Sequence, residues 1–370
     1  DFHNTPSKLD DRKQMLKGNW PTVGCDYCKD IEKVGGQSDR ITNLDFPGIY
    51  PPVELSDRPD EINVTPRILE VYFDNQCNLK CVYCGPHFSS LWEQENKKFS
   101  KEDLIHTTRY QGSKNLEKNT DKLFEWLEKN VHSLTNMNIL GGEPLYQHQL
   151  DRCFSFFEEN PAPNLSLQIF SNLNAPFSKI ENVIKKIKYL IDNNHIRSFS
   201  VTASLDCWGP SAEFARFPLK LDIWERNFLR FLQEDYIELI VGSTITPVTI
   251  GTLYQLFEKI EEYNQVRPVY RYFNSAETPD YMQLDIFGNA LAEHFDKAID
   301  VYSKYANTQD DQQRIEYLKG IALQSVSGKI DLEKVTKLYD FLEEMNYKRG
   351  TDWRKSCPWL EKIFKDILNR

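Results

Sequence analysis

Between residues 66 and 275, short runs of β-branched and aromatic residues alternate with longer charged segments of helical period. The expected strands cover residues 67–73, 137–140, 165–170, 199–205, 239–245 and 268–273. The expected helices, with apolar residues three or four apart, cover residues 121–131, 150–158, 179–193, 221–233 and 253–263. Such alternation favours right-handed βα units, so the pattern predicts an α/β core whose parallel sheet stays open or curls into a barrel.

The segments on either side of this core follow different patterns. Residues 1–65 are polar and interrupted by glycine and proline, with one short helical pattern at residues 8–16, which predicts an appendage and connector. Residues 276–370 are mostly of helical period and show no clear repeat. The chain is therefore expected to divide into an appendage at 1–65, a core at 66–275 and a helical C-terminal region at 276–370.

Composition and charge narrow the class of protein. A chain of 370 residues with 40% hydrophobic and 27% charged residues is typical of a large globular domain and argues against disorder. The net charge of −10 and the lack of a basic, aromatic-rich segment argue against a broad nucleic-acid surface. With no membrane-length apolar stretch and no secretory signal, we expect a cytoplasmic protein, although the sequence begins at Asp1 rather than Met.

Cysteine spacing gives the strongest chemical signal. Five of the eight cysteines fall in two tight groups, Cys25 with Cys28, and Cys77 with Cys81 and Cys84. Such spacing predicts metal binding in a reducing compartment rather than a disulfide scaffold. The second group follows the first expected strand, and three thiolates can hold a [4Fe-4S] cluster while leaving one iron open. A structural zinc site, with His87 as a further ligand, is the alternative.

The second cysteine group resembles the signature of the radical S-adenosylmethionine superfamily. Cys77, Cys81 and Cys84 are spaced by three and two residues, and the aromatic Tyr83 precedes the last of them. The resemblance covers about residues 66–275 and implies a partial (β/α)6 TIM-like barrel. It also implies a [4Fe-4S] cluster whose open iron binds S-adenosylmethionine, a 5'-deoxyadenosyl radical that abstracts hydrogen from a substrate, and a reducing protein such as a flavodoxin or ferredoxin.

The ends of the following strands carry the residues that the resemblance assigns to the cofactor. The second strand ends at a motif that looks like the family's GGE motif, which binds the cofactor's amino group: Gly141, Gly142, Glu143 and Pro144. Other expected cofactor contacts are Tyr83, Ser171, Asn172, Ser204, Asp206 and Arg216. Among these, Arg216 would supply a cation for a carboxylate. Helix capping and turn formation are competing roles for Ser171, Asn172 and Asp206.

Four further residues are candidates for the catalytic chamber. Glu70 and Tyr72 share one face of the first strand, and Arg271 lies on the last strand, where Tyr270 and Tyr272 face the opposite way. Either face could line a polar chamber, and a solvated or salt-bridged face is the alternative. Cys207 follows a strand end, where a thiol could donate a hydrogen atom to a substrate radical. By contrast, Cys153 lies in an apolar helical run and is expected to be a buried small hydrophobe.

The first cysteine group predicts a second metal site. The stretch from residue 8 to 43, which contains Cys25 and Cys28, resembles the middle of the SPASM and twitch type of auxiliary iron-sulfur domain, although that domain usually follows the barrel. Cys357 near the other terminus is expected to return and complete this auxiliary cluster. Zinc, or no metal, is the alternative.

These features lead to competing functions. The auxiliary-domain resemblance favours a peptide or peptide-like substrate altered by epimerisation, crosslinking or a related step. A small-molecule substrate such as an amino acid, sugar or nucleoside is the rival within the same chemistry. A zinc-stabilised binding protein is the rival from another class, and the acidic balance counts against nucleic-acid modification.

Overall fold

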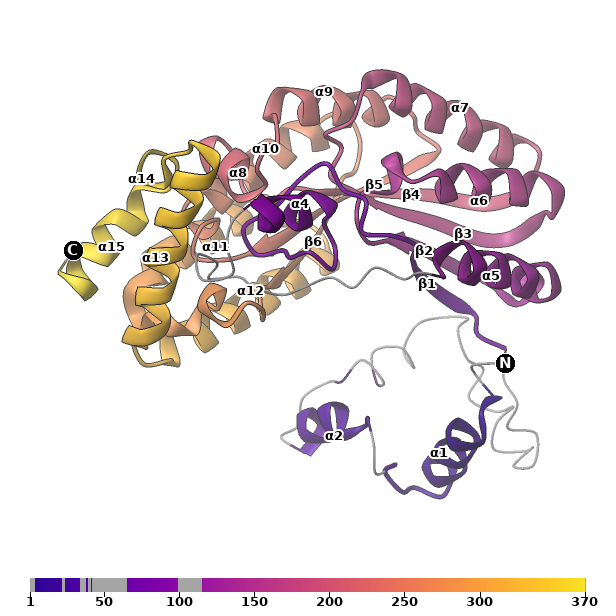
Figure 1. The fold of residues 1–370 in the computed structure, drawn as a ribbon, viewed down its shortest axis with the longest axis horizontal. Coiled ribbons are helices and arrows are strands. Elements are labelled where there is room, and N and C mark those ends of the chain that lie inside the picture. The colour runs from indigo at the N-terminus through magenta and orange to yellow at the C-terminus, as the bar shows by residue number, and fades with distance from the viewer. Residues whose placement is uncertain are drawn as a thin grey trace.

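The computed structural model describes residues 4–21, 24–33, 38, 41, 65–98 and 115–369, and its centre is one sheet of six parallel strands (Figure 1). The strands lie in chain order, and each pairs in parallel with the next. They are β1 (Ile68–Tyr72), β2 (Asn136–Leu140), β3 (Ala162–Ser171), β4 (Ile196–Ser204), β5 (Ile237–Ile245) and β6 (Tyr270–Ser275). The six predicted strands are confirmed, and β3 begins earlier than predicted because Ala162 already pairs with Ile196.

Helices connect consecutive strands, as the alternating pattern predicted. They are α5 (Leu116–Asn130), α6 (His148–Glu159), α7 (Phe177–Asp192), α8 (Pro210–Ala215), α9 (Leu221–Leu232) and α10 (Leu253–Asn264). The strands alternate buried and more open positions, so Leu167 and Ile169 of β3 are completely buried while Gln168 between them is not. The apolar stripe of α7, which includes Ile180 and Ile187, is buried as well. One face of the sheet therefore forms the core with the helices, and the other face carries the polar positions.

The sheet remains open between its first and last strands. Among the described strands, β1 and β6 are the two edge strands of the sheet, and no hydrogen-bonded ladder joins them. Together with the alternating helices, this arrangement is an α/β fold consistent with a partial TIM-like barrel. Parallel strands point the same way, so the loops after all six strands meet at one end of the sheet.

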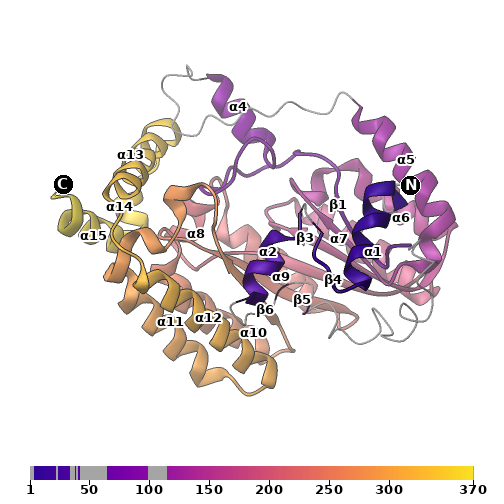
Figure 2. The same ribbon diagram turned by 90° about the horizontal axis from the view of Figure 1, so that it is seen from below.

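The C-terminal region is helical, as predicted, and packs against the core (Figures 1 and 2). Its helices are α11 (Ala292–Tyr305), α12 (Gln309–Ser327), α13 (Leu332–Arg349), α14 (Trp353–Ser356) and α15 (Pro358–Leu368). The described residues also form short 3-10 turns: η3 (Val131–Ser133), η4 (Pro144–Tyr146), η5 (Ile250–Thr252), η6 (Asp280–Met282) and η7 (Asp285–Leu291). Helix α11 packs on α10 and on α12, and α14 packs on α8, so the C-terminal helices cover the β4 to β6 half of the core.

Three further helices precede the second strand. These are α1 (Pro6–Leu16), α2 (Asp26–Lys33) and α4 (Ser90–Lys98). The helical pattern at residues 8–16 is confirmed by α1, which buries none of its residues. Helix α4 carries the buried Trp92, whose ring stacks on Phe341 of α13 at a centroid distance of 6.4 Å. None of the helices described is both long and apolar enough to cross a membrane.

Candidate active site at the carboxyl ends of the strands

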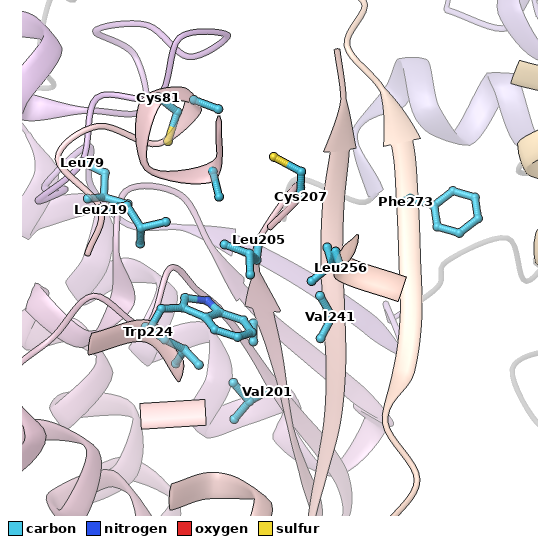
Figure 3. Close-up of a cluster of buried hydrophobic side chains, with 14 of the residues drawn as sticks. Leu79, Cys81, Val201, Leu205, Cys207, Leu219, Trp224, Val241, Leu256 and Phe273 are labelled. Atoms are coloured by element: carbon cyan, nitrogen blue, oxygen red, sulfur yellow. The ribbon is translucent and has the colours of Figure 1, made fainter. Parts of the chain in front are cut away.

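The second cysteine group lies in the loop between β1 and α4, at the carboxyl end of the sheet. We call residues 74–89 the cysteine loop. Its backbone pairs with the end of α8 and the following turn, since Lys80 N donates to Phe217 O at 2.7 Å and Val82 N donates to Ala215 O at 2.8 Å. The indole Nε1 of Trp92 donates to Cys81 O at 2.8 Å. These bonds fix the loop, and Cys81 belongs to the buried cluster shown in Figure 3.

The three thiols of the loop lie close enough to influence one another. Burial raises the pKa of each thiol, and the neighbouring Cys81 raises the pKa of both Cys77 and Cys84 further. Leu79 N donates to Cys77 Sγ at 3.4 Å, and Asn172 Nδ2 lies 3.9 Å from the same sulfur. Within the described ranges, no three His, Cys, Asp or Glu side chains are arranged to hold a single metal ion.

The predicted glycine motif forms a turn that fits under the cysteine loop. Gly141 and Gly142 both have positive φ, at 80° and 58°, which glycine adopts without steric cost. A Cβ atom on Gly142 would lie 2.8 Å from Asp74 O, and one on Gly141 would lie 2.6 Å from the ring of Tyr72. Glu143 N donates to Gln76 O at 2.8 Å. The turn and the loop therefore approach each other at a distance that only glycine permits.

Glu143 points into the protein rather than toward an open site. Its side chain is completely buried, and its carboxylate accepts from Ser171 Oγ at 2.8 Å, Asn172 N at 2.6 Å and Leu145 N at 3.1 Å. Burial raises the pKa of Glu143 to about 7 although these donors act in the opposite direction. In this structure the carboxylate joins the glycine turn to the end of β3, and Pro144 begins η4 beside it; the expected contact of Glu143 with the cofactor's ammonium stays a prediction.

Asn172 connects the end of β3 to the cysteine loop. Its Nδ2 donates to Asn78 Oδ1 at 2.8 Å, and Asn78 Nδ2 donates to Asn174 O at 2.6 Å. Asn172 Oδ1 accepts from Asn174 N at 2.8 Å, which is the turn-forming role that competed with cofactor binding. Ser171 has a structural role too, since its Oγ accepts from Leu173 N at 3.1 Å while donating to Glu143.

Asp206 is the centre of a buried polar network after β4. Its carboxylate receives two hydrogen bonds from Arg216, from Nε at 2.9 Å and from Nη2 at 2.7 Å, in a bidentate pair. Tyr83 Oη donates to the same carboxylate at 2.7 Å, and Thr244 N donates to it at 2.9 Å. The charge of Arg216 is therefore balanced by Asp206 inside the protein, and its expected contact with a carboxylate of the cofactor stays a prediction.

The Tyr83 ring lines a hollow at the carboxyl ends of β5 and β6. The hollow has a volume of about 430 Å³ and is also lined by Thr244, Asn274, Ser275, Ala276, Glu277, Thr278 and Tyr317. A volume of this size lies within the range of small-molecule and cofactor sites. The aromatic residue of the cysteine motif thus faces a cavity whose walls are mostly polar.

The expected chamber residues separate into two groups. Glu70 and Tyr72 lie on the more open face of β1, and Tyr270 and Tyr272 lie on the more open face of β6. Arg271 faces the helices instead: it is buried, forms ion pairs with Glu261 and Asp311, and stacks on Tyr302. The expectation that Arg271 lines the chamber is therefore wrong, because the alternation of β6 places Tyr270 and Tyr272, and not Arg271, on the open face of the sheet.

Three other candidates occupy different surroundings. Ser204 ends β4 in a half-buried position and pairs with Gly242. Cys207 is completely buried, belongs to the cluster in Figure 3, and its Sγ donates to Ser211 Oγ at 3.4 Å. A thiol without exposure does not meet a substrate, so its expected hydrogen-donor role is not supported. Cys153 is buried, as predicted.

The structure does not bring Cys357 to a surface metal site. Cys357 is completely buried, and its Sγ donates to Val248 O at 3.4 Å. Burial raises the pKa of the Cys357 thiol, and the nearby Cys207 raises this pKa further. Cys25 and Cys28 are half-buried at the start of α2. The described residues contain no three-cysteine auxiliary group, and this part of the prediction is corrected because Cys357 packs into the apolar core.

The residues that connect the cysteine loop to α4 and α13 were not among those predicted from the sequence. Lys80, between Cys77 and Cys81, forms an ion pair with Glu95 of α4, and Arg349 Nη2 of α13 lies 2.9 Å from Glu95 Oε2. The position of Lys80 between two cysteines was a usable signal. Arg349 gave none, because 254 residues separate it from Glu95.

Comparisons with known proteins add little to this geometry. No protein-family model matches the chain, and no curated protein matches it. Among solved structures, the X-ray structure of the FeFe-hydrogenase maturase HydG from Carboxydothermus hydrogenoformans aligns with 98% of this chain and 95% of that chain, at 13% identity and a TM-score of 0.23. A likeness at that identity and score carries no inference about fold or function.

Proposed function

We propose that this chain is a radical S-adenosylmethionine enzyme that abstracts hydrogen from a peptide or peptide-like substrate. The observation that carries the proposal is the contact between two motifs from different strand ends. The loop of Cys77, Cys81 and Cys84 lies on the Gly141–Gly142 turn. The backbone oxygens of the loop lie so close to Gly142 that no side chain fits at this position. Strand ends of a parallel sheet are where such folds bind ligands.

The loop offers three thiols, those of Cys77, Cys81 and Cys84, which suit a cubane cluster with one open iron, whereas a structural zinc ion normally takes four ligands. The Leu79 N–H directed at Cys77 Sγ is a donor of the kind that stabilises a ligating thiolate.

Cys77, Cys81 and Cys84 would hold the cluster, which with S-adenosylmethionine would supply one-electron cleavage of the sulfonium bond and hydrogen abstraction from a substrate. The chain's own residues position and enclose these groups. Tyr83 Oη is held by Asp206, so its ring is fixed at the wall of the hollow. Asn172 donates a hydrogen bond to Asn78, the residue after Cys77, and this bond holds the loop over the glycine turn.

The finer parts of the proposal rest on the sequence resemblance. The twitch-like appendage supports a peptide substrate, and within it Cys25 and Cys28 are proposed as ligands of an auxiliary metal. A flavodoxin or ferredoxin is proposed as the electron donor. A small-molecule substrate would share every step at the cysteine loop and differ only in what the open face of the sheet binds.

The test is 5'-deoxyadenosine formation by anaerobically reconstituted protein with S-adenosylmethionine and dithionite, measured by mass spectrometry. We expect product from the natural chain, none from Cys81→Ala, and unchanged product from Cys153→Ala, which removes a buried thiol outside the loop. Iron and sulfide are assayed in each sample. Absence of product from a sample that holds four irons and four sulfides per loop, or zinc in place of iron in protein purified without reconstitution, would overturn the proposal.

A further inference from the structure

A charged network lies against the cysteine loop on the side of α4 and α13. Lys80, which precedes Cys81 in the loop, pairs with Glu95 of α4, and Arg349 Nη2 of α13 lies 2.9 Å from Glu95 Oε2. The side chains of Glu95 and Arg349 are almost completely buried, and that of Lys80 is 17% exposed. Two cations therefore share one carboxylate, which leaves one positive charge in excess where salt screens it little.

Aromatic rings lie against both cations of this network. Lys80 Nζ lies 5.3 Å from the centre of the Phe217 ring, and the Arg349 guanidinium lies 5.6 Å from the same centre. The guanidinium also lies 4.5 Å from the centre of the Trp92 ring. Arg349 Nη1 is buried and has no hydrogen-bond partner in the described part of the chain, so Glu95 compensates only part of the guanidinium. In such surroundings a charge acts strongly on its neighbours.

Hydrogen bonds fix the network to the backbone of the loop. Trp92 Nε1 donates to Cys81 O at 2.8 Å, and Lys80 N donates to Phe217 O at 2.7 Å. Both residues whose rings contact the cations are thus bonded to the loop at Cys81 or at the residue before it. The excess positive charge is therefore held next to one of the three candidate ligands.

A second buried ion pair touches the loop through Tyr83. Tyr83 Oη donates to Asp206 at 2.7 Å, and Asp206 pairs with Arg216 in a one-to-one arrangement. This pair adds no net charge, and the buried carboxyl of Glu143 in the turn below the loop can add only a negative one. The positive excess beside the loop therefore comes from the network of α4 and α13.

We propose that Lys80 and Arg349, with Glu95 as their shared counter-ion, favour the reduced state of an iron-sulfur cluster bound on the cysteine loop. Reduction brings one electron from the reducing protein, or from dithionite in vitro, and adds one negative charge at the loop. A nearby cation without a full counter-charge stabilises that added charge. The inference rests on the proposed function for the presence of the cluster. Arg349 acts through Lys80 and Trp92 and is a positioning residue.

A redox titration of the reconstituted full chain, at one fixed pH and without S-adenosylmethionine, tests the proposal. Electron paramagnetic resonance gives the ratio of reduced to oxidised cluster at each potential. We expect Lys80→Met, which removes a cation, to lower this ratio by about tenfold, which corresponds to about 59 mV for one electron. We expect Glu95→Gln, which removes the anion, to raise it by a similar factor. A loosened loop would shift both variants in the same direction, so opposite shifts identify an effect of charge.

Three further variants complete the titration. Lys80→Arg keeps the charge and should hold the ratio within about twofold of the natural chain. Arg349→Met removes the second cation and should lower the ratio in the fraction of protein that keeps its cluster. Lys97→Met is the control and should leave the ratio unchanged, because Lys97 of α4 is 70% exposed and pairs with Glu93 of the same helix. Iron content and circular dichroism of each variant show that cluster and fold are retained.

Equal ratios in the natural chain, Lys80→Met and Glu95→Gln, or shifts of the same sign in the two variants, would overturn the inference. If Glu95→Gln does not fold, the comparison of Lys80→Met with Lys80→Arg decides in its place. Formation of 5'-deoxyadenosine by a chain whose cluster potential ignores these charges would reject this inference alone. Charge-dependent potentials without 5'-deoxyadenosine from the natural chain would reject the proposed function alone, and uptake of zinc without iron would reject both.

Discussion

Arg349 Nη2 lies 2.9 Å from Glu95 Oε2, and both side chains are almost completely buried. Glu95 also pairs with Lys80 in the middle of the cysteine loop. The guanidinium of Arg349 lies 4.5 Å from the centre of the Trp92 ring, whose Nε1 donates to Cys81 O. The last turn of α13 is thereby connected to the loop both through charge and through an aromatic side chain. The C-terminal region is part of the candidate site although none of its helices connects two strands.

Replacing Arg349 by Met should loosen the cysteine loop. Loss of one partner from a buried ion pair costs on the order of 3 kcal/mol, and the substitution also removes the cation stacked on Trp92. We expect the purified variant to retain less than half of the iron bound by the natural chain. Lys348→Met is the matched control, because Lys348 is equally buried but pairs with Glu344 of its own helix. Equal iron content in the two variants would contradict this account.

Asp206→Asn should destabilise the whole carboxyl end of the sheet. The substitution removes the charge that balances Arg216 and leaves a buried guanidinium without its bidentate partner. We expect a loss of about 3–5 kcal/mol in the free energy of unfolding, measured by urea denaturation of the metal-free chain. Asp222→Asn, on an exposed position of α9, should change it by less than about 0.5 kcal/mol. A urea midpoint for Asp206→Asn that matches the natural chain would show that the pair contributes little.

The stability of the metal-free chain should fall as pH rises toward neutral because of Glu143. Burial raises the pKa of Glu143 from 4.5 to about 7, so between these values the folded chain holds a proton that the unfolded chain has released. The stabilisation from this group is complete below pH 4.5 and is lost as pH rises through about 7. Its full size is on the order of 3 kcal/mol, because each pH unit of difference corresponds to 1.36 kcal/mol.

Glu143→Gln tests this dependence because glutamine cannot ionise. We expect the free energy of unfolding to decrease less between pH 5 and pH 8 in the variant than in the natural chain. Urea denaturation at both pH values gives the difference directly. Parallel pH dependences for the two proteins would mean that Glu143 ionises with an ordinary pKa.

Alanine at the two glycines of the turn should give different outcomes in a double-mutant experiment. Gly141→Ala meets the ring of Tyr72, so adding Tyr72→Ala removes the clash and leaves the cost of a positive φ, about 1 kcal/mol. Gly142→Ala meets backbone oxygens of the cysteine loop, including Asp74 O, so no side-chain truncation relieves it. Thermal unfolding of the three single variants and of the two double variants that carry Tyr72→Ala measures this contrast. Rescue of Gly142→Ala by Tyr72→Ala would contradict the geometry.

The elements and the strand-end positions of the motifs could be predicted from sequence, because hydrophobic period and cysteine spacing are local properties. The direction of individual side chains could not. Alternation along β6 allowed either Arg271 or Tyr272 to face inward, and the choice depended on Glu261 and Asp311 from distant helices. The burial of Cys357 beside Val248 likewise depends on how α14 packs on the barrel. Pairings of this kind arise only once the chain is folded.

The lack of a ladder between β1 and β6 has a consequence for how a long ligand is admitted. A closed ring of strands accepts a ligand only along its axis, with one end entering first. In the part of the chain that the structure describes, the sheet has an unpaired seam at these two strands, with Tyr72 of β1 on one side and Tyr272 of β6 on the other. A polymer can be laid sideways along such a seam. An interior residue of that polymer then reaches the open face of the sheet without either terminus being threaded through the protein.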